Sequence, residues 1–253
     1  MVAAVKLHRQ LTRRRERRFL VEGAHLVEAA SGRGLIREIF ATEAVAQRYA
    51  DLLGRQDATV NLVTERAAKA LSDTVTPAGL VAVCALPGFG LDDVLAGGPR
   101  LVAVGVEIGE PGNAGTLIRV ADAMGAAAVV FGGHSVDPYN GKCLRASAGS
   151  VFSIPVVVAP DAGAAVTALQ VAGLRVLATT VDGELSLDDV ELAGPTAWLF
   201  GAEAHGLSPQ LAQHADNRVA IPMSGGAQSL NVAAAAAICL YQSARAQRTN
   251  PDR

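Results

Sequence analysis

A helix-forming stretch near the middle of the chain carries a cation among apolar residues. In NAGTLIRVADAMGA (residues 113–126), Asn113 stands where the helix is expected to begin, and Arg119 lies among the apolar positions. An asparagine there can cap the helix by accepting a backbone N–H. Arg119 has two interpretations: an i,i+3 surface ion pair with Asp122, worth a few tenths of a kcal/mol, or a contact with an anionic ligand.

A second stretch places a carboxylate in a glycine-rich turn. LFGAEAHGLS (residues 199–208) follows an apolar run that predicts a buried strand, and Glu203 stands between Gly201 and Gly206. Glycines in such a turn admit a ligand against the backbone. A carboxylate just past the strand can orient a hydrogen-bond donor or position a neighbouring arginine. The alternative interpretation is that Glu203 is an ordinary charged loop residue.

A third stretch combines a polar turn with an almost wholly apolar helix. In IPMSGGAQSLNVAAAAAICL (residues 221–240), Ser229 or Asn231 is expected to open the helix. Its first turns are nearly all apolar, which indicates a helix buried in the core or in a subunit interface.

Positive charge is concentrated near the beginning of the chain. The formal net charge is −2, yet the segment Lys6–Arg18 holds seven lysines and arginines against one acid, Glu16. Such a cluster can neutralise phosphates, with an affinity that falls as salt rises, or it can be a solvated helical face. Phosphate contacts would supply affinity rather than sequence choice. The residues predicted to contact nucleic acid are Arg13, Arg14, Arg15, Arg17, Arg18 and, further along the chain, Arg145.

The first part of the chain reads as a small α/β domain with a linker behind it. Residues 19–86 alternate helical and strand patterns, beginning with helical spacing over residues 19–30. The predicted amino-terminal domain is therefore 1–86. The stretch PGFGLDDVLAGGPR (87–100) is rich in Gly and Pro and is interpreted as the linker.

The remainder, residues 101–253, predicts a second α/β domain. Six continuous apolar runs are separated mostly by helical stretches. Runs that are apolar on both faces indicate a parallel sheet with helices on both sides. Ligands of such sheets lie beyond the carboxyl ends of the strands, which is where the three polar stretches fall.

Several classes of protein are disfavoured. No apolar run reaches the roughly 18–20 residues of a membrane span, and the first residues lack the pattern of a signal peptide. Cys84, Cys143 and Cys239 are far apart and odd in number, which suits neither a disulfide framework nor a zinc site. We therefore expect reduced, mostly buried thiols in a cytoplasmic protein, and no metal. Neither G-x-G-x-x-G nor G-x-x-x-x-G-K-[ST] occurs.

Together, the three stretches resemble the three motifs of the SpoU (TrmH-type) RNA ribose methyltransferases of the SPOUT class. Their order and spacing match over roughly residues 101–243. The matching residues are Asn113, Gly115 and Arg119 for N-x-G-x-x-x-R; Gly201, Glu203 and Gly206 for G-x-E-x-x-G; and Ile221, Pro222, Met223, Ser229, Leu230, Asn231 and Val232 for I-P-M…S-L-N-V.

The resemblance extends beyond these motifs, with one departure. The segment VDPYNGKCLRASAGSVFSIPV (136–156) resembles the middle segment of the family, and residues 19–86 more loosely resemble its amino-terminal substrate-binding domain. Family members often carry Asp-Pro or Asn-Pro before the first-motif asparagine. Here the pair is Glu110-Pro111, which can alter the loop but leaves Asn113 and Arg119 in place.

The resemblance implies an enzyme that uses S-adenosyl-L-methionine to methylate a ribose 2′-hydroxyl in structured RNA. It implies a trefoil knot in the carboxyl-terminal domain, an exception to the rule against knots. It also implies a homodimer whose active site takes residues from both subunits. Relatives with an amino-terminal substrate domain mostly act on large-subunit ribosomal RNA and others on tRNA, so 23S rRNA is the expected substrate and tRNA the alternative.

The resemblance also assigns roles to residues. The cofactor is expected at Gly201, Ile221 and Leu230, with Leu199, Thr179 and Met223 as further candidates. Catalysis is expected at Arg119, Asn113, Glu203, Ser229 and Asn231. The motif-one arginine is proposed to help deprotonate the hydroxyl, but arginine has a pKa above about 12. We therefore prefer a role in which Arg119 holds the adjacent phosphate and stabilises the developing alkoxide.

Two other classes of function remain as alternatives. One is an RNA-binding relative that has lost catalysis, which would fail to bind S-adenosylmethionine. The other is a nucleotide-dependent oxidoreductase on a doubly wound sheet, which the absence of the fingerprint glycines disfavours.

Overall fold

The computed structural model describes residues 1–249, so residues 250–253 of the predicted carboxyl-terminal domain lie outside the described part. The chain divides into two compact units. Unit 1 comprises Met1–Gly88 and Asp137–Phe152, and unit 2 comprises Phe89–Val136 and the chain from Ser153 onward. We call Asp137–Phe152 the insert. It belongs to unit 1, which differs from the predicted division of the chain, where 101–253 form one domain.

Unit 1 is built on a four-stranded mixed sheet in the order β1-β4-β2-β3. The β1–β4 and β4–β2 pairs are antiparallel, and the β2–β3 pair is parallel. Its strands are β1 (Arg18–Glu22), β2 (Ile36–Ala41), β3 (Thr59–Leu62) and β4 (Leu80–Ala85). Its helices are α1 (Val2–Val5), η1 (Lys6–His8), α2 (Gln10–Glu16), α3 (Ala24–Ser31), α4 (Glu43–Arg48), α5 (Ala50–Gly54) and α6 (Glu65–Leu71), with α9 (Gly141–Ser147) and η2 (Ser150–Phe152) from the insert.

One local prediction in this part of the chain is wrong, and the segment interpreted as the linker contains a short helix. The expected helix over residues 19–30 begins only with α3, because Phe19 and Val21 point inward on β1 and are almost fully buried. Gly23, with φ of +90°, separates the strand from the helix. The expected linker contains a helix, α7 (Leu91–Ala96), whose start is fixed by the N–H of Gly90 donating to the carboxylate of Asp93 (2.8 Å).

Unit 2 is a seven-stranded sheet in the order β7-β6-β5-β10-β8-β11-β9, parallel throughout. This confirms the predicted parallel sheet, although β9 was not foreseen. The strands are β5 (Leu101–Val106), β6 (Ala128–Gly132), β7 (Val156–Ala159), β8 (Arg175–Thr179), β9 (Leu185–Ser186), β10 (Thr196–Phe200) and β11 (Asn217–Ala220). Besides α7, its helices are α8 (Pro111–Ala123), α10 (Ala162–Val171), α11 (Pro209–His214) and α12 (Val232–Thr249).

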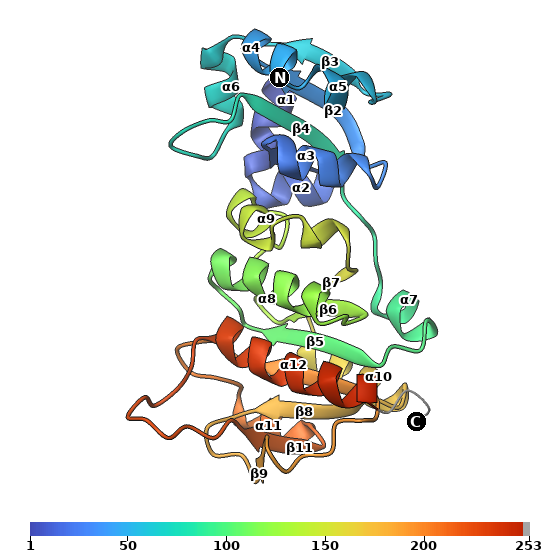
Figure 1. Cartoon of the computed structure of the whole chain (residues 1–253), viewed down its shortest axis with the longest axis vertical. Coiled ribbons are helices and arrows are strands. Elements are labelled where there is room, and N and C mark those ends of the chain that lie inside the picture. Colours follow the sequence, from blue (N-terminus) through green and yellow to red (C-terminus); the bar gives the residue numbers. More distant parts are fainter. Residues whose placement is uncertain (250–253) are drawn as a thin grey trace. The chain divides into compact units, whose positions relative to one another are not determined.

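Helices cover both faces of this sheet. On one face, α8 and α12 lie side by side over β5 and β10 (Figure 1), and the indole of the fully buried Trp198 donates to the hydroxyl of Ser243 on α12 (2.8 Å). On the other face, apolar residues of α7, α10 and α11 share one core with alternate residues of β5. Among residues 1–249 no helix is long and apolar enough to span a membrane. The trefoil knot stays a prediction.

Candidate functional site

Two of the three motifs follow neighbouring strands. β5 and β10 pair in parallel, with Phe200 opposite Gly105, so the turns that follow them emerge at the same edge of the sheet. The sheet continues through β6 on one side of this pair and through β8 on the other. This is a topological switch point, where open α/β sheets bind their ligands. Asn113 and Glu203 therefore belong to one edge of unit 2.

Asn231 joins the three motifs. Its side-chain nitrogen donates to Oδ1 of Asn113 (3.1 Å) and to Oε1 of Glu203 (2.5 Å). Its side-chain oxygen accepts the N–H of Ala233 (2.9 Å) and so caps α12. The nitrogen and the oxygen of this one amide thus both form hydrogen bonds, and they connect the start of α12 to Asn113 and Glu203. We call this cluster of three side chains the Asn231 junction.

The cap of α8 differs from the prediction. The helix begins at Pro111, and its N-cap is Glu110 rather than Asn113: the carboxylate of Glu110 accepts the N–H of Asn113 (2.9 Å). The reason is that Pro favours the first helical position and leaves the residue before it as the cap. Asn113 consequently lies inside the first turn, where its side chain is available to Asn231.

Arg119 extends from α8 into solvent. Among residues 1–249 it has no hydrogen bond or ion pair, so the predicted surface pair with Asp122 is absent from the structure. An exposed guanidinium without a partner keeps its five donors available for an anion. The contact of Arg119 with an anionic ligand stays a prediction.

A hollow of about 430 Å³ lies beside the Asn231 junction. Five of the six predicted cofactor residues line it, together with Glu203 and Ser229 of the predicted catalytic set. Leu199 does not: it is fully buried, and its carbonyl accepts the hydroxyl of Thr179 (2.8 Å). The five that line the hollow are Thr179, Gly201, Ile221, Met223 and Leu230.

The glycines of the second motif have a structural task, and their predicted contact with a ligand stays a prediction. A Cβ on Gly201 would lie 2.2 Å from the carbonyl carbon of Gly206 and 2.3 Å from the nitrogen of Leu207. The N–H of Gly206 donates to the carbonyl of Ala202 (2.8 Å), and Gly206 has a φ of +66°. The missing side chain at Gly201 therefore makes room for the loop's own backbone, and the closed loop then forms part of the wall of the hollow.

Sequence reasoning missed a charged group at the rim of the hollow. Asp182 and Arg218 both line it, and their side chains are 3.4 Å apart. Arg218 is held by Glu184, which accepts from its backbone N–H and from its Nε (both 2.8 Å). These contacts, the backbone N–H first, keep the pKa of Glu184 below its usual range. The position of Asp182 in the turn that follows β8 was the available signal.

The predicted RNA-binding arginines separate into two groups. Arg13 is a correction: it is 5% exposed, and its guanidinium donates to Asp137 of the insert and to the carbonyls of Leu7 and His8. A buried charge needs such partners, so Arg13 is not available to a phosphate. The exposed members are Arg14, Arg15, Arg17 and Arg18.

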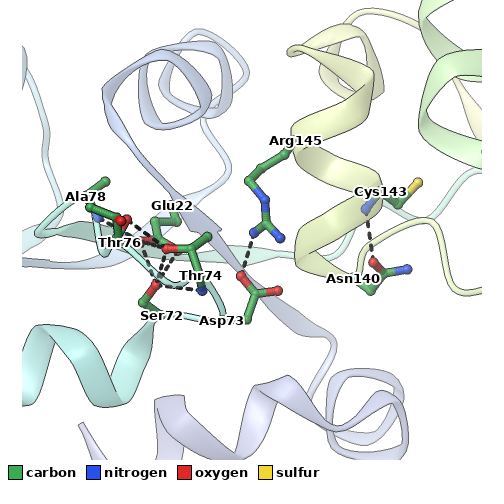
Figure 2. A network of polar contacts seen from close by, with 9 residues as sticks. All are labelled: Glu22, Ser72, Asp73, Thr74, Thr76, Ala78, Asn140, Cys143 and Arg145. Carbon is green, nitrogen blue, oxygen red and sulfur yellow. Dashed lines mark hydrogen bonds and ion pairs between the residues drawn. The ribbon is translucent and has the colours of Figure 1, made fainter. Parts of the chain in front are cut away.

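Arg145 of the insert has a partner in unit 1. Figure 2 shows its guanidinium meeting the carboxylate of Asp73 (2.5 Å), with both side chains more than a third exposed. Next to Asp73, the carboxylate of Glu22 accepts from the hydroxyl of Ser72 and from the N–H of Ala78. Arg145 is therefore partly accessible, but it enters any contact with RNA from an existing ion pair.

Cysteines and metal ligands contribute little to the site. All three cysteines are free and buried. No group of three or more His, Cys, Asp or Glu side chains in the described part of the chain could hold a metal ion.

Family models and a curated relative match this chain. Residues 100–241 match the model of the SpoU rRNA Methylase family, and residues 3–82 match that of the MRM3-like substrate binding domain. The chain is 35% identical, over 93% of its length and 92% of the relative's, to the 23S rRNA (guanosine(2553)-2'-O)-methyltransferase RlmP of Bacillus subtilis.

Solved structures of related methyltransferases also align with this chain. The SpoU methyltransferase AviRb from Streptomyces viridochromogenes, solved in complex with AdoMet, aligns with a TM-score of 0.87 and 31% identity over 98% of this chain and 97% of that one. A structure described as giving insights into 2-OH methylation of C/U34 on tRNA aligns with a TM-score of 0.55 and 28% identity, over 60% of this chain and 98% of that one. The chain belongs to the SpoU rRNA methylase family.

Proposed function

We propose that this protein transfers a methyl group from S-adenosyl-L-methionine to a ribose 2′-hydroxyl of 23S ribosomal RNA. The observation that carries the proposal is the Asn231 junction beside the hollow. It brings the three motifs of a SpoU methyltransferase to one edge of a parallel sheet, next to a space for a small molecule.

The hollow suits the cofactor. Its volume of about 430 Å³ lies in the range of small-molecule sites, which are mostly apolar with a few placed polar groups. Apolar side chains for the adenine come from Phe200, Ile221 and Leu230, and polar groups come from Thr179 and Thr180. When bound, S-adenosylmethionine supplies a methyl group activated by its positive sulfonium.

The protein must then position the ribose and stabilise the oxygen that attacks. Arg119 holds the phosphate next to the target ribose and stabilises the negative charge on the 2′-oxygen as its proton passes to solvent water. A guanidinium stays charged and cannot itself act as a base at neutral pH. Asn113 and Glu203, fixed by Asn231, orient the ribose or Arg119. Ser229 shapes the acceptor side of the hollow.

Ribosomal RNA is favoured over tRNA by the extent of the likeness. One relative matched along almost the whole chain, RlmP, is named as a 23S rRNA enzyme, and another, from Synechocystis, is named as a tRNA/rRNA methyltransferase. The tRNA-related structure matches only 60% of the chain. Unit 1, with its surplus of exposed arginines, supplies the grip on a large structured RNA, and such an enzyme is expected in the cytoplasm.

We further propose that two copies form the active enzyme. Arg119 does not line the hollow of its own chain, as expected if each site takes its arginine from the second copy. On α12, Ile238 and Tyr241 are 38% and 49% exposed and three residues apart, an apolar contact surface for a partner helix. Light scattering should give a dimer, and Ile238→Glu should give a monomer without activity.

The test of the proposed function uses labelled S-adenosylmethionine with unmodified 23S rRNA and unmodified tRNA as substrates. The expected product is labelled 23S rRNA with a single position that resists alkaline cleavage, because a 2′-O-methyl group blocks it. Label in tRNA would overturn the substrate and keep the chemistry. Absence of label, together with failure to bind the cofactor, would favour an RNA-binding relative without catalysis.

A further inference from the structure

Unit 1 contains a pocket of its own, with a volume of about 240 Å³. We call it the unit 1 pocket. Its volume lies below the roughly 300–1,000 Å³ of sites for drug-sized ligands, so it suits a ligand about as large as one flat ring system. Both the amino-terminal part of unit 1 and the insert contribute to its walls. Five leucines line it: Leu7, Leu20, Leu26, Leu71 and Leu144.

An ion pair forms the polar side of this pocket. Arg145 of α9 donates from Nη1 to Oδ1 of Asp73 (2.5 Å), and both residues line the pocket (Figure 2). Within the part of the chain that the structure describes, neither side chain makes another hydrogen bond. Arg145 therefore keeps free N–H donors, and Asp73 keeps free acceptor capacity, next to one another at the pocket.

Asp73 is held in place from two sides. The hydroxyls of its neighbours Ser72 and Thr74 both donate to the carboxylate of Glu22 on β1 (2.7 and 3.3 Å). On the insert, a Cβ on Gly141 would lie 2.2 Å from Oδ2 of Asp73, so the carboxylate packs directly on the start of α9. Because these contacts exist without a ligand, little conformational entropy remains to be lost at Asp73 when a ligand binds.

An adjacent donor and acceptor of this kind fit one edge of guanine. The Watson–Crick edge of guanine presents the acceptor O6 next to the donors N1–H and N2–H₂, so Arg145 can donate to O6 while Asp73 accepts from the N–H groups. Adenine presents the opposite order on this edge, an amino donor beside a ring acceptor. The leucines supply apolar contacts for the ring itself, as in other small-molecule sites.

The surroundings of the pocket favour a guanine that belongs to an RNA chain. Arg13, which lines the pocket, is part of α2, and the next two residues of that helix, Arg14 and Arg15, are exposed. Exposed arginines can neutralise phosphates. Proteins recognise RNA sequence mainly at unstacked bases of loops and bulges, which are free to enter a pocket. One unstacked nucleotide of a structured RNA supplies both a base for the pocket and phosphates for the arginines.

We propose that the unit 1 pocket binds one unstacked guanine of the RNA substrate, with Arg145 and Asp73 forming hydrogen bonds to its Watson–Crick edge. The proposal rests on the proposed function, in which the substrate is RNA, and it adds a place where unit 1 distinguishes one base from another. The exposed arginines of α2 supply affinity, and the pocket supplies sequence choice. The ion pair thereby has a role beyond stability, to which an exposed pair contributes little.

The test measures binding of short RNA rather than methylation. Fluorescence anisotropy on the full chain compares labelled uridine pentamers that carry either guanine or adenine at the centre. The wild-type protein should bind the guanine pentamer about tenfold more tightly, since a matched two-point contact to a base edge discriminates at least that well. In Asp73→Ala and in Arg145→Ala this ratio should fall toward one. Because the ratio is taken within one protein, general damage to a variant cancels.

Two further variants separate base recognition from a purely structural role. The exchange Asp73→Arg with Arg145→Asp keeps an ion pair but reverses the order of donor and acceptor, so it should lose the preference for guanine. A pair that only stabilises the fold would keep the preference in this variant. Ala70 lines the pocket from an exposed position on α6, so Ala70→Phe adds bulk at the pocket and should also bring the ratio toward one.

Matched controls are Arg37→Ala and Asp51→Ala, which remove exposed charges of unit 1 outside the pocket. Both should keep the wild-type ratio. A ratio near one in the wild-type protein, or an unchanged ratio in both Asp73→Ala and Arg145→Ala, would overturn this proposal alone. Guanosine monophosphate that binds as tightly as the guanine pentamer would assign the pocket to a free nucleotide and so overturn the RNA occupant. Failure of the wild-type protein to bind S-adenosylhomocysteine would instead overturn the proposed function.

Discussion

The two units of the molecule carry opposite charge. Unit 1 contains 15 lysines and arginines against 10 aspartates and glutamates, a formal charge of +5, whereas unit 2 contains 7 against 14, a formal charge of −7. An acidic body repels phosphates and a basic one attracts them. Unit 2, which contains the motifs, therefore gains little affinity for RNA from its own charge. The proposed function therefore assigns RNA binding to unit 1 and catalysis to unit 2.

The comparison also shows that the number of arginines in a unit does not tell how many of them lie on its surface. In unit 1, Arg13 belongs to the interior and Arg14 to the surface, although they are adjacent. In unit 2, Arg119 stands exposed and without a partner among the residues described. Variants can therefore distinguish arginines that stabilise the fold, arginines that bind RNA, and Arg119, which the proposed function assigns to the reaction.

The largest effect is expected at Arg119. Arg119→Ala should lower the methylation rate at saturating RNA by about 100- to 1,000-fold, because the developing charge loses its stabilising group, while S-adenosylhomocysteine binding stays within about twofold. Single-turnover kinetics and calorimetry measure the two. As a contrast, Arg14→Ala should raise KM and leave kcat nearly unchanged. Equal losses of kcat in both variants would erase the distinction between the units.

Next comes the buried ion pair of unit 1. Asp137→Ala leaves the guanidinium of Arg13 buried without its carboxylate, which should cost about 3–5 kcal/mol of unfolding free energy. Urea denaturation measures it. Glu16→Ala is the control, since Glu16 pairs with an Arg15 side chain that is 75% exposed, and exposed pairs contribute about 0–1 kcal/mol. Similar stability of both variants would refute the structural role of Arg13.

The exposed arginines should determine the salt dependence of RNA binding. Replacing Arg14 and Arg15 by alanine should reduce the slope of log affinity against log salt by about 0.7–0.9 for each phosphate that the variant no longer neutralises. Fluorescence anisotropy with a fragment of 23S rRNA at several salt concentrations gives the slope. The matched variant is Arg13→Met, whose slope should equal that of the wild type. A slope that is also reduced in Arg13→Met would place that residue on the RNA.

Within unit 2, the capping and tethering roles of Asn231 can be separated. Asn231→Ser keeps an oxygen that can cap α12 but loses the amide that reaches Asn113 and Glu203. Stability should stay within about 0.5 kcal/mol while activity falls, whereas Asn231→Ala should in addition lose about 1 kcal/mol. Thermal melts and initial rates compare them. Full activity of the serine variant would remove the junction from the mechanism.

The smallest signal comes from the thiols, which report on each unit separately. Burial raises the pKa of Cys84 to about 12 and that of Cys239 above its usual range, so neither should react with a thiol reagent at pH 8 until its unit unfolds. Cys143 of the insert should become labelled together with Cys84 of unit 1 as urea is raised. Mass spectrometry of the labelled peptides reads this out. If Cys143 became labelled at the same urea concentration as Cys239 instead, the division of the chain into these two units would be wrong.

Ionisation of these thiols has a defined sign in its effect on stability. The folded pKa of Cys84 is raised, so the unfolded chain loses this proton first as pH increases. The stabilisation that comes from keeping the thiol protonated is complete below the ordinary pKa of 9.0 and is lost as pH rises through about 12.

The sequence predicted what local patterns control. Continuous apolar runs such as the one at β5 are buried on both faces only in a covered parallel sheet, and the motifs after β5 and β10 meet because parallel strands end at the same edge. The hollow lined by Thr179, Ile221 and Leu230 follows from that arrangement. In contrast, the burial of Arg13 depends on Asp137, and no local pattern connects residues that distant in the chain.

Competition between alternative local structures accounts for the other differences between the prediction and the structure. Asn113 is a good capping residue, but Glu110 followed by Pro111 starts the helix earlier and frees the asparagine for the junction. Phe19 and Val21 fit a helical spacing as well as an alternating one, and pairing with β4 decides for the strand. The partner of Arg145, Asp73, lies in another domain of the predicted division, which is why its ion pair was not foreseen.

The insert limits how genes of this kind can recombine. The chain passes between the units at residues 88–89, 136–137 and 152–153, so a crossover at the linker alone would part residues 1–88 from Asp137–Phe152. The amino-terminal half would then lose the aromatic neighbours of Phe19, Tyr139 (4.9 Å) and Phe152 (6.2 Å), and the counter-ion of Arg13. A chimera that exchanges the substrate-binding half between family members should fold only when its insert is inherited from the same parent.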